Sequence, residues 1–170
     1  MKTELSPIKK FMLLYVVYIS LFFILVEHTF FQSLIDINGF FSNSVTYFSA
    51  NILELFVPLT YNRYFIHLPN GSLAVLFGCS GLESVILYLS AVLAYPAMQK
   101  ERLYGFIIGF IVINIINIVR IVALGYVFVY HHSIFDITHD YITQNIMIVF
   151  VFLVFVVYLN WIGEQDEAKA

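Results

Sequence analysis

The sequence predicts an all-α integral membrane protein with four transmembrane helices, an interfacial helix and a short external β-hairpin before the second span. Of its 170 residues, 61% are hydrophobic and 11% are charged, whereas soluble domains are about 45–50% apolar and about 25% charged. Many of the apolar residues occur in runs of about 20, the length that crosses a bilayer. A soluble fold of this size cannot bury so much apolar surface, so we expect a polytopic protein embedded in the lipid bilayer.

The first predicted span covers residues 11–31 and reads FMLLYVVYISLFFILVEHTFF. No small-residue cleavage site ends this run, which favours a retained helix over a removed signal peptide. Glu27 and His28 indicate that the helix nears the membrane surface at its end.

Residues 42–60 form a more polar helical stretch. Apolar side chains recur on one predicted helical face, at Val45, Phe48, Ile52, Leu55 and Leu59. Polar residues interrupt the remainder, at Asn43, Thr46, Ser49 and Glu54. This pattern favours a helix at the membrane interface or packed against the bundle. The alternative is that this stretch is a fifth span.

A β-hairpin is predicted next. The β-prone runs YFIHL and SLAVLF flank the turn sequence PNG at residues 69–71. Asn-Gly between two such runs is a strong hairpin signal.

Three further apolar runs complete the bundle. The second span ends at Pro96, a residue that stops helices. We find no repeats, and a short acidic tail, GEQDEAKA, ends the chain, so residues 1–170 are expected to form one domain. These three spans cover residues 80–96, 103–130 and 141–161.

Charge placement predicts the orientation. With four spans and a cytoplasmic N-terminus, six basic residues lie inside: Lys2, Lys9, Lys10, Lys100, Arg102 and Lys169. Only Arg63 then lies in an external loop, and Arg120 lies within a span. Five spans would divide the same charges four inside and three outside. The positive-inside rule therefore favours four spans, with both termini in the cytoplasm.

This topology places three reactive side chains at one depth. Cys79, the only cysteine, falls at the outer end of the second span. Arg120 is 17 residues beyond the start of the third span, about 26 Å along a helix that rises ~1.5 Å per residue. His139 lies in the external loop or at the outer end of the fourth span. In a compact bundle these three side chains can converge.

Each of these side chains can instead have a purely structural role, without taking part in catalysis. Cys79 can be a packing residue, although Ser80 and Gly81 suggest that it lies at a helix start, where the helix dipole favours a thiolate. Arg120 can extend its side chain out of the span to reach the membrane interface, although Asn114 and Asn117 form a polar stripe with it.

The neighbouring polar residues leave alternatives open. His139 can be a solvated loop residue, and His131 and His132 compete with it for a catalytic role. Asp136 is interpreted as a turn or capping residue. Glu83 lies four residues after Cys79, on the same helical face, where it positions Arg120 or the backbone, or lines a polar cavity.

Together, a thiol, an imidazole and a guanidinium meet the requirements of cysteine nucleophilic catalysis. The alternative is a non-enzymatic membrane assembly or transport partner with a polar intramembrane cavity. A metalloprotease is disfavoured because the chain has no HExxH motif. No zinc-ligand spacing predicts a metal or other cofactor, and no basic cluster predicts nucleic-acid binding.

The elements GCSGLES and NIVR, followed by a histidine, resemble the exosortase/archaeosortase family of membrane-embedded cysteine transpeptidases. The resemblance covers residues 76–161 and is strongest to short members of the exosortase H type. It implies that Cys79 is the nucleophile and His139 the general acid–base. It also implies that Arg120 orients the substrate or stabilises the oxyanion. Asn117 matches the Asn of the Asn-x-x-Arg element, and Ser80, Gly81 and Glu83 are expected to support the site.

The resemblance also implies the partners. Such enzymes cleave exported proteins whose C-terminal tail holds a short motif, a hydrophobic helix and a basic end. Cleavage occurs on the outer face of the cell membrane, and the acyl group passes to an acceptor that the sequence does not identify. Many members carry a glycine shortly after the histidine, whereas this chain reads HDYITQN, which keeps His131 and His132 as alternatives.

Overall fold

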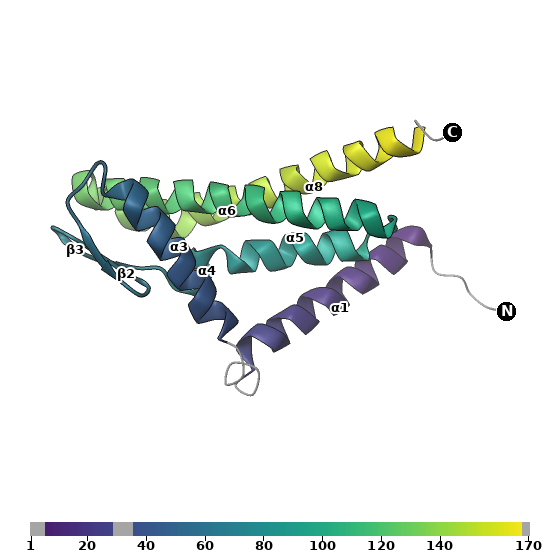
Figure 1. Cartoon of the computed structure of the whole chain (residues 1–170), viewed down its shortest axis with the longest axis horizontal. Helices are drawn as coiled ribbons and strands as arrows, with labels where there is room; N and C mark the ends of the chain where they lie inside the picture. The colour runs from purple at the N-terminus through teal and green to yellow at the C-terminus, as the bar shows by residue number, and fades with distance from the viewer. Residues whose placement is uncertain (1–5, 29–35, 168–170) are drawn as a thin grey trace.

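A computed structural model describes residues 6–28 and 36–167 of the chain as a mostly helical bundle that carries a small sheet at one end (Figure 1). Within these ranges, three helices are long and apolar enough to cross a membrane, over Pro7–Glu27, Gln99–Tyr130 and Gln144–Gln165. They belong to α1 (Pro7–Glu27), α6 (Gln99–Tyr130) and α8 (Gln144–Glu167).

The second predicted span is shorter than expected. Instead of 80–96, α5 covers Leu82–Ala94, 13 residues, which is about 20 Å of helix at ~1.5 Å per residue. The helix ends at Ala94 and Tyr95 is extended, because Pro96 disfavours helical geometry in the residue before it. The prediction of four full-length spans is therefore replaced by three candidate spans and one shorter apolar helix.

The other predicted spans shift at their ends. The first begins at Pro7 rather than residue 11, and the end predicted at residues 29–31 lies outside the described residues. The third begins at Gln99 rather than residue 103. The fourth span, α8, begins at Gln144 rather than residue 141. The preceding residues Thr138–Thr143 form a π-helix, η2.

The short helix α5 lies at the centre of the bundle. It contacts α1, α6 and α8, and its buried side chains include Val85, Ile86, Tyr88 and Leu89. Because α5 is apolar on nearly every side, surrounding helices can cover it completely. The three longer helices expose large apolar side chains on their outer surfaces, as expected for helices in lipid.

Helix α3 covers Ile37–Leu53, so it begins and ends earlier in the chain than the helical stretch predicted over residues 42–60. Its first turn is capped by Asp36, whose side chain accepts a hydrogen bond from the Gly39 amide at 2.7 Å. The face that packs inward is rich in small and polar residues, namely Ser42, Val45, Thr46, Ser49, Ala50 and Leu53.

The predicted apolar face of α3 is not the buried one. Phe48, Ile52 and Leu55 are exposed, and only Val45 is buried with the small residues. Small side chains let helices approach closely in a membrane protein, where lipid solvates large apolar side chains. The inward face of α3 therefore combines small and polar residues with Val45 and Leu53, while Phe48 and Ile52 remain exposed.

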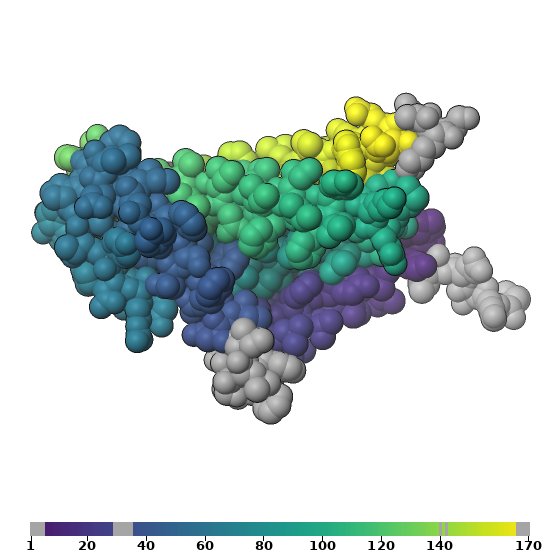
Figure 2. Space-filling model, viewed as in Figure 1, coloured from purple at the N-terminus to yellow at the C-terminus, as the bar shows by residue number. Residues whose placement is uncertain are grey.

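The predicted hairpin is confirmed. Strands β2 (Phe65–Leu68) and β3 (Gly71–Ala74) pair antiparallel, with Leu68 opposite Gly71. A third strand, β1 (Thr60–Asn62), pairs with β2 to give the order β1-β2-β3. The buried side chains of Ile66 and Leu73 join a hydrophobic cluster with α3 and α6. In Figure 2 the sheet and α3 close one end of the bundle.

Candidate active site

Cys79 lies on a single helical turn between the sheet and α5. This turn, α4, covers Phe77–Ser80. The backbone amides of Cys79 and Ser80 both donate to the carbonyl of Leu76, at 2.8 and 2.7 Å. The Ser80 hydroxyl donates to the carbonyl of Phe77 at 3.0 Å and accepts from the amide of Leu82 at 3.4 Å. The thiol is therefore presented from a well-bonded turn, just before the first residue of α5.

Gly81 makes the junction between α4 and α5 possible. Its φ of 82° is left-handed, a conformation that glycine adopts without steric cost. A Cβ atom at this position would also lie 2.6 Å from Cγ of Asn117. Gly81 thus permits both the turn and the close approach of α6.

Asn117 of α6 holds this turn from the other side. Its side chain is fully buried, and its Nδ2 donates to the carbonyls of Cys79 at 3.2 Å and Ser80 at 2.7 Å. Its Oδ1 accepts from Nη1 of Arg120 at 3.4 Å. One amide group therefore links the cysteine turn to the arginine.

His139 meets the thiol from the π-helix η2. Its Nε2 lies 3.0 Å from Sγ of Cys79, across 60 residues of sequence. The ring stacks against Phe135, with centroids 5.6 Å apart, and the His139 carbonyl accepts from the hydroxyl of Thr143. Single turns of π-helix are frequently found at functional sites.

The alternative histidines lie elsewhere. His131 and His132 are both exposed, and the His132 ring packs against Phe128 and Phe135. The histidine that the fold places within hydrogen-bond distance of Cys79 is His139.

Arg120 is half-buried one helical turn beyond Asn117. Burial opposes its positive charge, whereas a thiolate at Cys79 and the carboxylate of Glu83, in the first turn of α5, would favour it. Its Nε is buried and has no hydrogen-bond partner among the described residues. Asn114, the third member of the predicted polar stripe, instead donates to the carbonyl of Phe110 in its own helix.

The site combines a thiol, an imidazole at proton-transfer distance and a neighbouring cation. Such an arrangement can deprotonate the thiol and stabilise negative charge close to it. In the described part of the chain, no three His, Cys, Asp or Glu side chains gather as metal ligands.

Comparison with known families identifies the family of the chain. Residues 8–162 match the family described as Transmembrane exosortase (Exosortase_EpsH). The chain belongs to the transmembrane exosortase family. The match begins at residue 8, so it includes α1 and α3, whereas the motifs that carry the resemblance in the sequence begin near residue 76. No curated protein and no solved structure matches the chain.

Membership has direct functional implications. Exosortases are membrane cysteine transpeptidases that act in protein sorting, on proteins with C-terminal sorting signals.

Two supporting residues were missed in the sequence, Phe135 and Thr143. They lie four residues before and four residues after His139, the spacing of contacts along a helix. Recognising residues 135–140 as helical would have identified them, but the fourth span was predicted to begin only at residue 141, with His139 in the external loop or at the outer end of that span.

Proposed function

We propose that this exosortase is a membrane-embedded cysteine protease and transpeptidase that uses Cys79 as nucleophile and His139 as general acid–base. In this function it cleaves the C-terminal sorting tail of exported proteins and transfers the upstream part to an acceptor. The observation that carries the proposal is the 3.0 Å contact between Sγ of Cys79 and Nε2 of His139, in a family of cysteine transpeptidases.

The first half of the reaction forms a thioester. His139 accepts the thiol proton, and the thiolate attacks the carbonyl carbon of the scissile peptide bond. The resulting tetrahedral oxyanion collapses, the C–N bond breaks, and His139 returns the proton to the leaving amine. The upstream part of the substrate is then an acyl group on Cys79.

The second half releases that acyl group. His139 accepts a proton from an acceptor nucleophile, which attacks the thioester carbonyl, and the thiol of Cys79 is regenerated on collapse. Water in place of the acceptor gives hydrolysis. Both halves use the same thiol–imidazole pair, so one site serves cleavage and transfer.

Arg120 is proposed to stabilise the oxyanion or to orient the scissile carbonyl. Asn117 holds one end of the guanidinium. Its Nε is buried without a partner in the described structure, so it can donate to a substrate oxygen once the side chain turns toward the substrate. Loss of one such donor typically costs about 10²–10³ in rate.

Glu83 is proposed as a counter-charge for Arg120 rather than as a catalytic group. It interacts electrostatically with the guanidinium, which supports the earlier alternative that it positions Arg120. Ser80 and Gly81 support the turn that carries the thiol.

The experiment that tests this function follows the size of an exported protein with a C-terminal sorting signal, encoded by the same genome and produced together with the enzyme. Cys79→Ala and Cys79→Ser are expected to abolish its cleavage. Ser90→Ala is the matched control, because Ser90 is a fully buried residue of α5 whose hydroxyl has no partner in the described structure.

Unchanged cleavage with Cys79→Ser would overturn the proposal. It would favour the alternative of a non-enzymatic assembly or transport partner, for which changes at Arg120 or Asn117 disrupt folding or binding while Cys79→Ser is silent.

A further inference from the structure

A line of four aromatic rings ends at His139. Its members are Phe128, His132, Phe135 and His139, spaced four, three and four residues apart. This is the spacing of side chains on one face of a helix, and it continues although the chain changes helix type between α6 and η2. The two short helices in between are η1 (His132–Ile134) and α7 (Phe135–Ile137). The line leads from the end of α6 to the thiol–imidazole pair.

Phe135 is the member of this line that contacts His139. The two rings stack with their centroids 5.6 Å apart and their planes 24° from parallel. The rings of Phe128 and Phe135 meet edge to face, with centroids 4.9 Å apart. The ring of His132 also lies nearly parallel to that of Phe135, at 6.4 Å. Phe135 is therefore held by neighbouring rings while it contacts the imidazole of His139.

The β-hairpin in turn packs against Phe128. A Cβ atom at Gly71 would lie 3.1 Å from the Phe128 ring, so the backbone of the hairpin turn lies close to that ring. Beside it, Nδ2 of Asn70 donates to the carbonyl of Val129 at 3.1 Å. These contacts attach the hairpin to the last turn of α6 and limit the positions that the Phe128 ring can occupy.

The orientation of the His139 ring decides whether it can accept the thiol proton. Its Nε2 lies 3.0 Å from Sγ of Cys79, and rotation of the ring about its Cβ–Cγ bond would carry Nε2 out of hydrogen-bond distance. The Thr143 hydroxyl donates to the carbonyl of His139 at 3.0 Å, which holds the backbone but not this rotation. A flat ring stacked on one face of the imidazole opposes the rotation, because aromatic pairs have preferred geometries.

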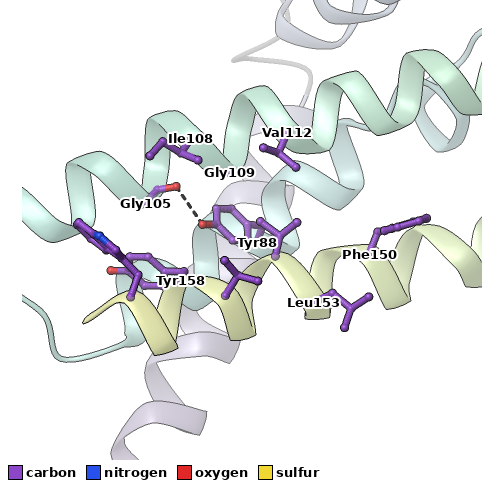
Figure 3. Close-up of a pocket in the computed structure, with 11 residues that line it drawn as sticks. Tyr88, Gly105, Ile108, Gly109, Val112, Phe150, Leu153 and Tyr158 are labelled. Carbon is purple, nitrogen blue, oxygen red and sulfur yellow. Dashed lines mark hydrogen bonds between the residues drawn. The ribbon is translucent and has the colours of Figure 1, made fainter. Parts of the chain in front are cut away.

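Packing alone is the simpler explanation for a buried aromatic ring, and Tyr88 illustrates it. The Tyr88 ring fills the space beside Gly109, and its hydroxyl donates to the carbonyl of Gly105 at 2.9 Å (Figure 3). Phe135 differs because it is only half-buried and because the face of its ring lies against the imidazole of the site. If packing were its only role, any apolar side chain of similar volume would replace it.

We propose that Phe135 is a positioning residue for the reaction of Cys79 and His139. Its ring keeps the imidazole in the orientation in which Nε2 points at Sγ. This orientation is needed when the thiol proton moves to Nε2 and again when that proton passes to the leaving amine. The inference rests on the proposed function, and it adds a side chain that takes no part in the bonds made or broken.

The first test replaces the ring of Phe135. Phe135→Leu keeps an apolar side chain of similar volume without a flat face, whereas Phe135→Tyr keeps the ring. With the purified exported protein as substrate, we expect kcat to fall about tenfold in Phe135→Leu, a part of the roughly 10²–10⁴-fold that a positioned acid–base contributes. Phe135→Tyr is expected to keep most of the rate. KM is expected to be unchanged in both, because the proposal gives Phe135 no contact with the substrate.

Phe65→Leu is the matched control. Phe65 of β2 also stacks on a histidine, His67, with ring centroids 6.4 Å apart. His67 lies on the sheet and bonds to the hydroxyl of Ser72. The control therefore loses the same group and the same kind of contact, and its kcat is expected to be unchanged. The midpoint of thermal unfolding of each variant shows whether the enzyme is folded at the assay temperature.

The second test needs no substrate. Cys79 is the only cysteine in the chain, so the intact mass of protein treated with iodoacetamide reports the alkylation of Cys79. The reactive form is the thiolate, which forms when His139 accepts the proton. At pH 7 we expect alkylation to be about tenfold slower in His139→Ala and slower to a smaller extent in Phe135→Leu. Phe135→Tyr and Phe65→Leu are expected to keep the original rate. Arg120, whose charge also acts on the thiol, is present in every variant.

The outcomes separate the two proposals. Equal kcat values for Phe135→Leu and Phe65→Leu would overturn the positioning role. An equal loss of rate in Phe135→Leu and Phe135→Tyr would overturn it as well, because the flat ring would then not be what the reaction needs. Either result leaves the proposed function in place when Cys79→Ala and His139→Ala are inactive. Cleavage that continues in His139→Ala overturns the proposed function itself.

Discussion

At the scale of single residues, the site depends on Asn117 as much as on the reactive side chains. Its amide bonds two backbone carbonyls of the cysteine turn and one guanidinium. Because the side chain is fully buried, water cannot replace these bonds when they are lost. We interpret Asn117 as a positioning residue that fixes where the thiol and Arg120 stand.

This role predicts a large effect of Asn117→Ala. Two buried carbonyls lose their donor, which costs on the order of 2–4 kcal/mol of stability in all, and cleavage of the exported protein is expected to fall as the turn loosens. Asn114→Ala is the control, because Asn114 bonds only within α6. The measurement is the midpoint of thermal unfolding of each detergent-solubilised variant. Equal midpoints for Asn117→Ala and Asn114→Ala would contradict the positioning role of Asn117.

The motif residues were predictable from the sequence, but their bonding was not. Cys79, Asn117, Arg120 and His139 stand out as polar groups in an apolar chain. The partners of Asn117 are backbone carbonyls, which carry no sequence signal. The resemblance favoured His139 but left His131 and His132 as alternatives. The π-turn over Thr138–Thr143 was not predicted, because the boundary between the external loop and the fourth span was placed within it.

At the scale of elements, glycines set how closely α6 approaches its neighbours. A side chain at Gly105 would meet the ring of Tyr158, and one at Gly109 would meet the ring of Tyr88. Gly163 of α8 has nothing within 4 Å of an added Cβ. These positions give opposite expectations for the same substitution.

Gly109→Ala is expected to destabilise the protein by about 1–3 kcal/mol through overpacking against Tyr88. Gly163→Ala is expected to stabilise it by up to about 1 kcal/mol, because alanine has the higher helix propensity. Thermal unfolding of both variants under the same detergent conditions is the measurement. A destabilised Gly163→Ala together with an unaffected Gly109→Ala would contradict this packing.

Helices and strands were predicted correctly where the local sequence signal was strong. They were missed where contacts with other parts of the chain determine the structure. The PNG turn and the long apolar runs correctly indicated the hairpin and the helices. The short strand β1 was missed because TYN has no alternating pattern and exists by pairing with β2. Which face of α3 packs inward was not predicted, because it depends on the small and polar residues that contact the bundle.

At the scale of the whole molecule, the candidate site lies at one end of the bundle. The start of α1 and the end of α8 lie at the other end, away from the sheet (Figure 1). Together with the placement of lysines and arginines, this supports our proposal that both termini are cytoplasmic and that the site is on the extracytoplasmic side.

The single cysteine allows a direct test of this orientation. In protein carrying Cys79→Ala, a cysteine is introduced by Thr60→Cys in β1 or by Lys10→Cys in α1, both at exposed positions. A membrane-impermeant maleimide added to intact cells is expected to label position 60 at once and position 10 only after the membrane is opened. The reverse labelling would contradict the proposed topology.

The central claim is that Cys79 carries the acyl group. The most direct measurement is the intact mass of the purified enzyme after incubation with the exported protein in the absence of an acceptor. We predict an added mass equal to the upstream part of the substrate, located on Cys79 and removed by neutral hydroxylamine, as expected for a thioester. Cleavage of the substrate with Cys79 unmodified throughout, or an adduct on another residue, would contradict the account.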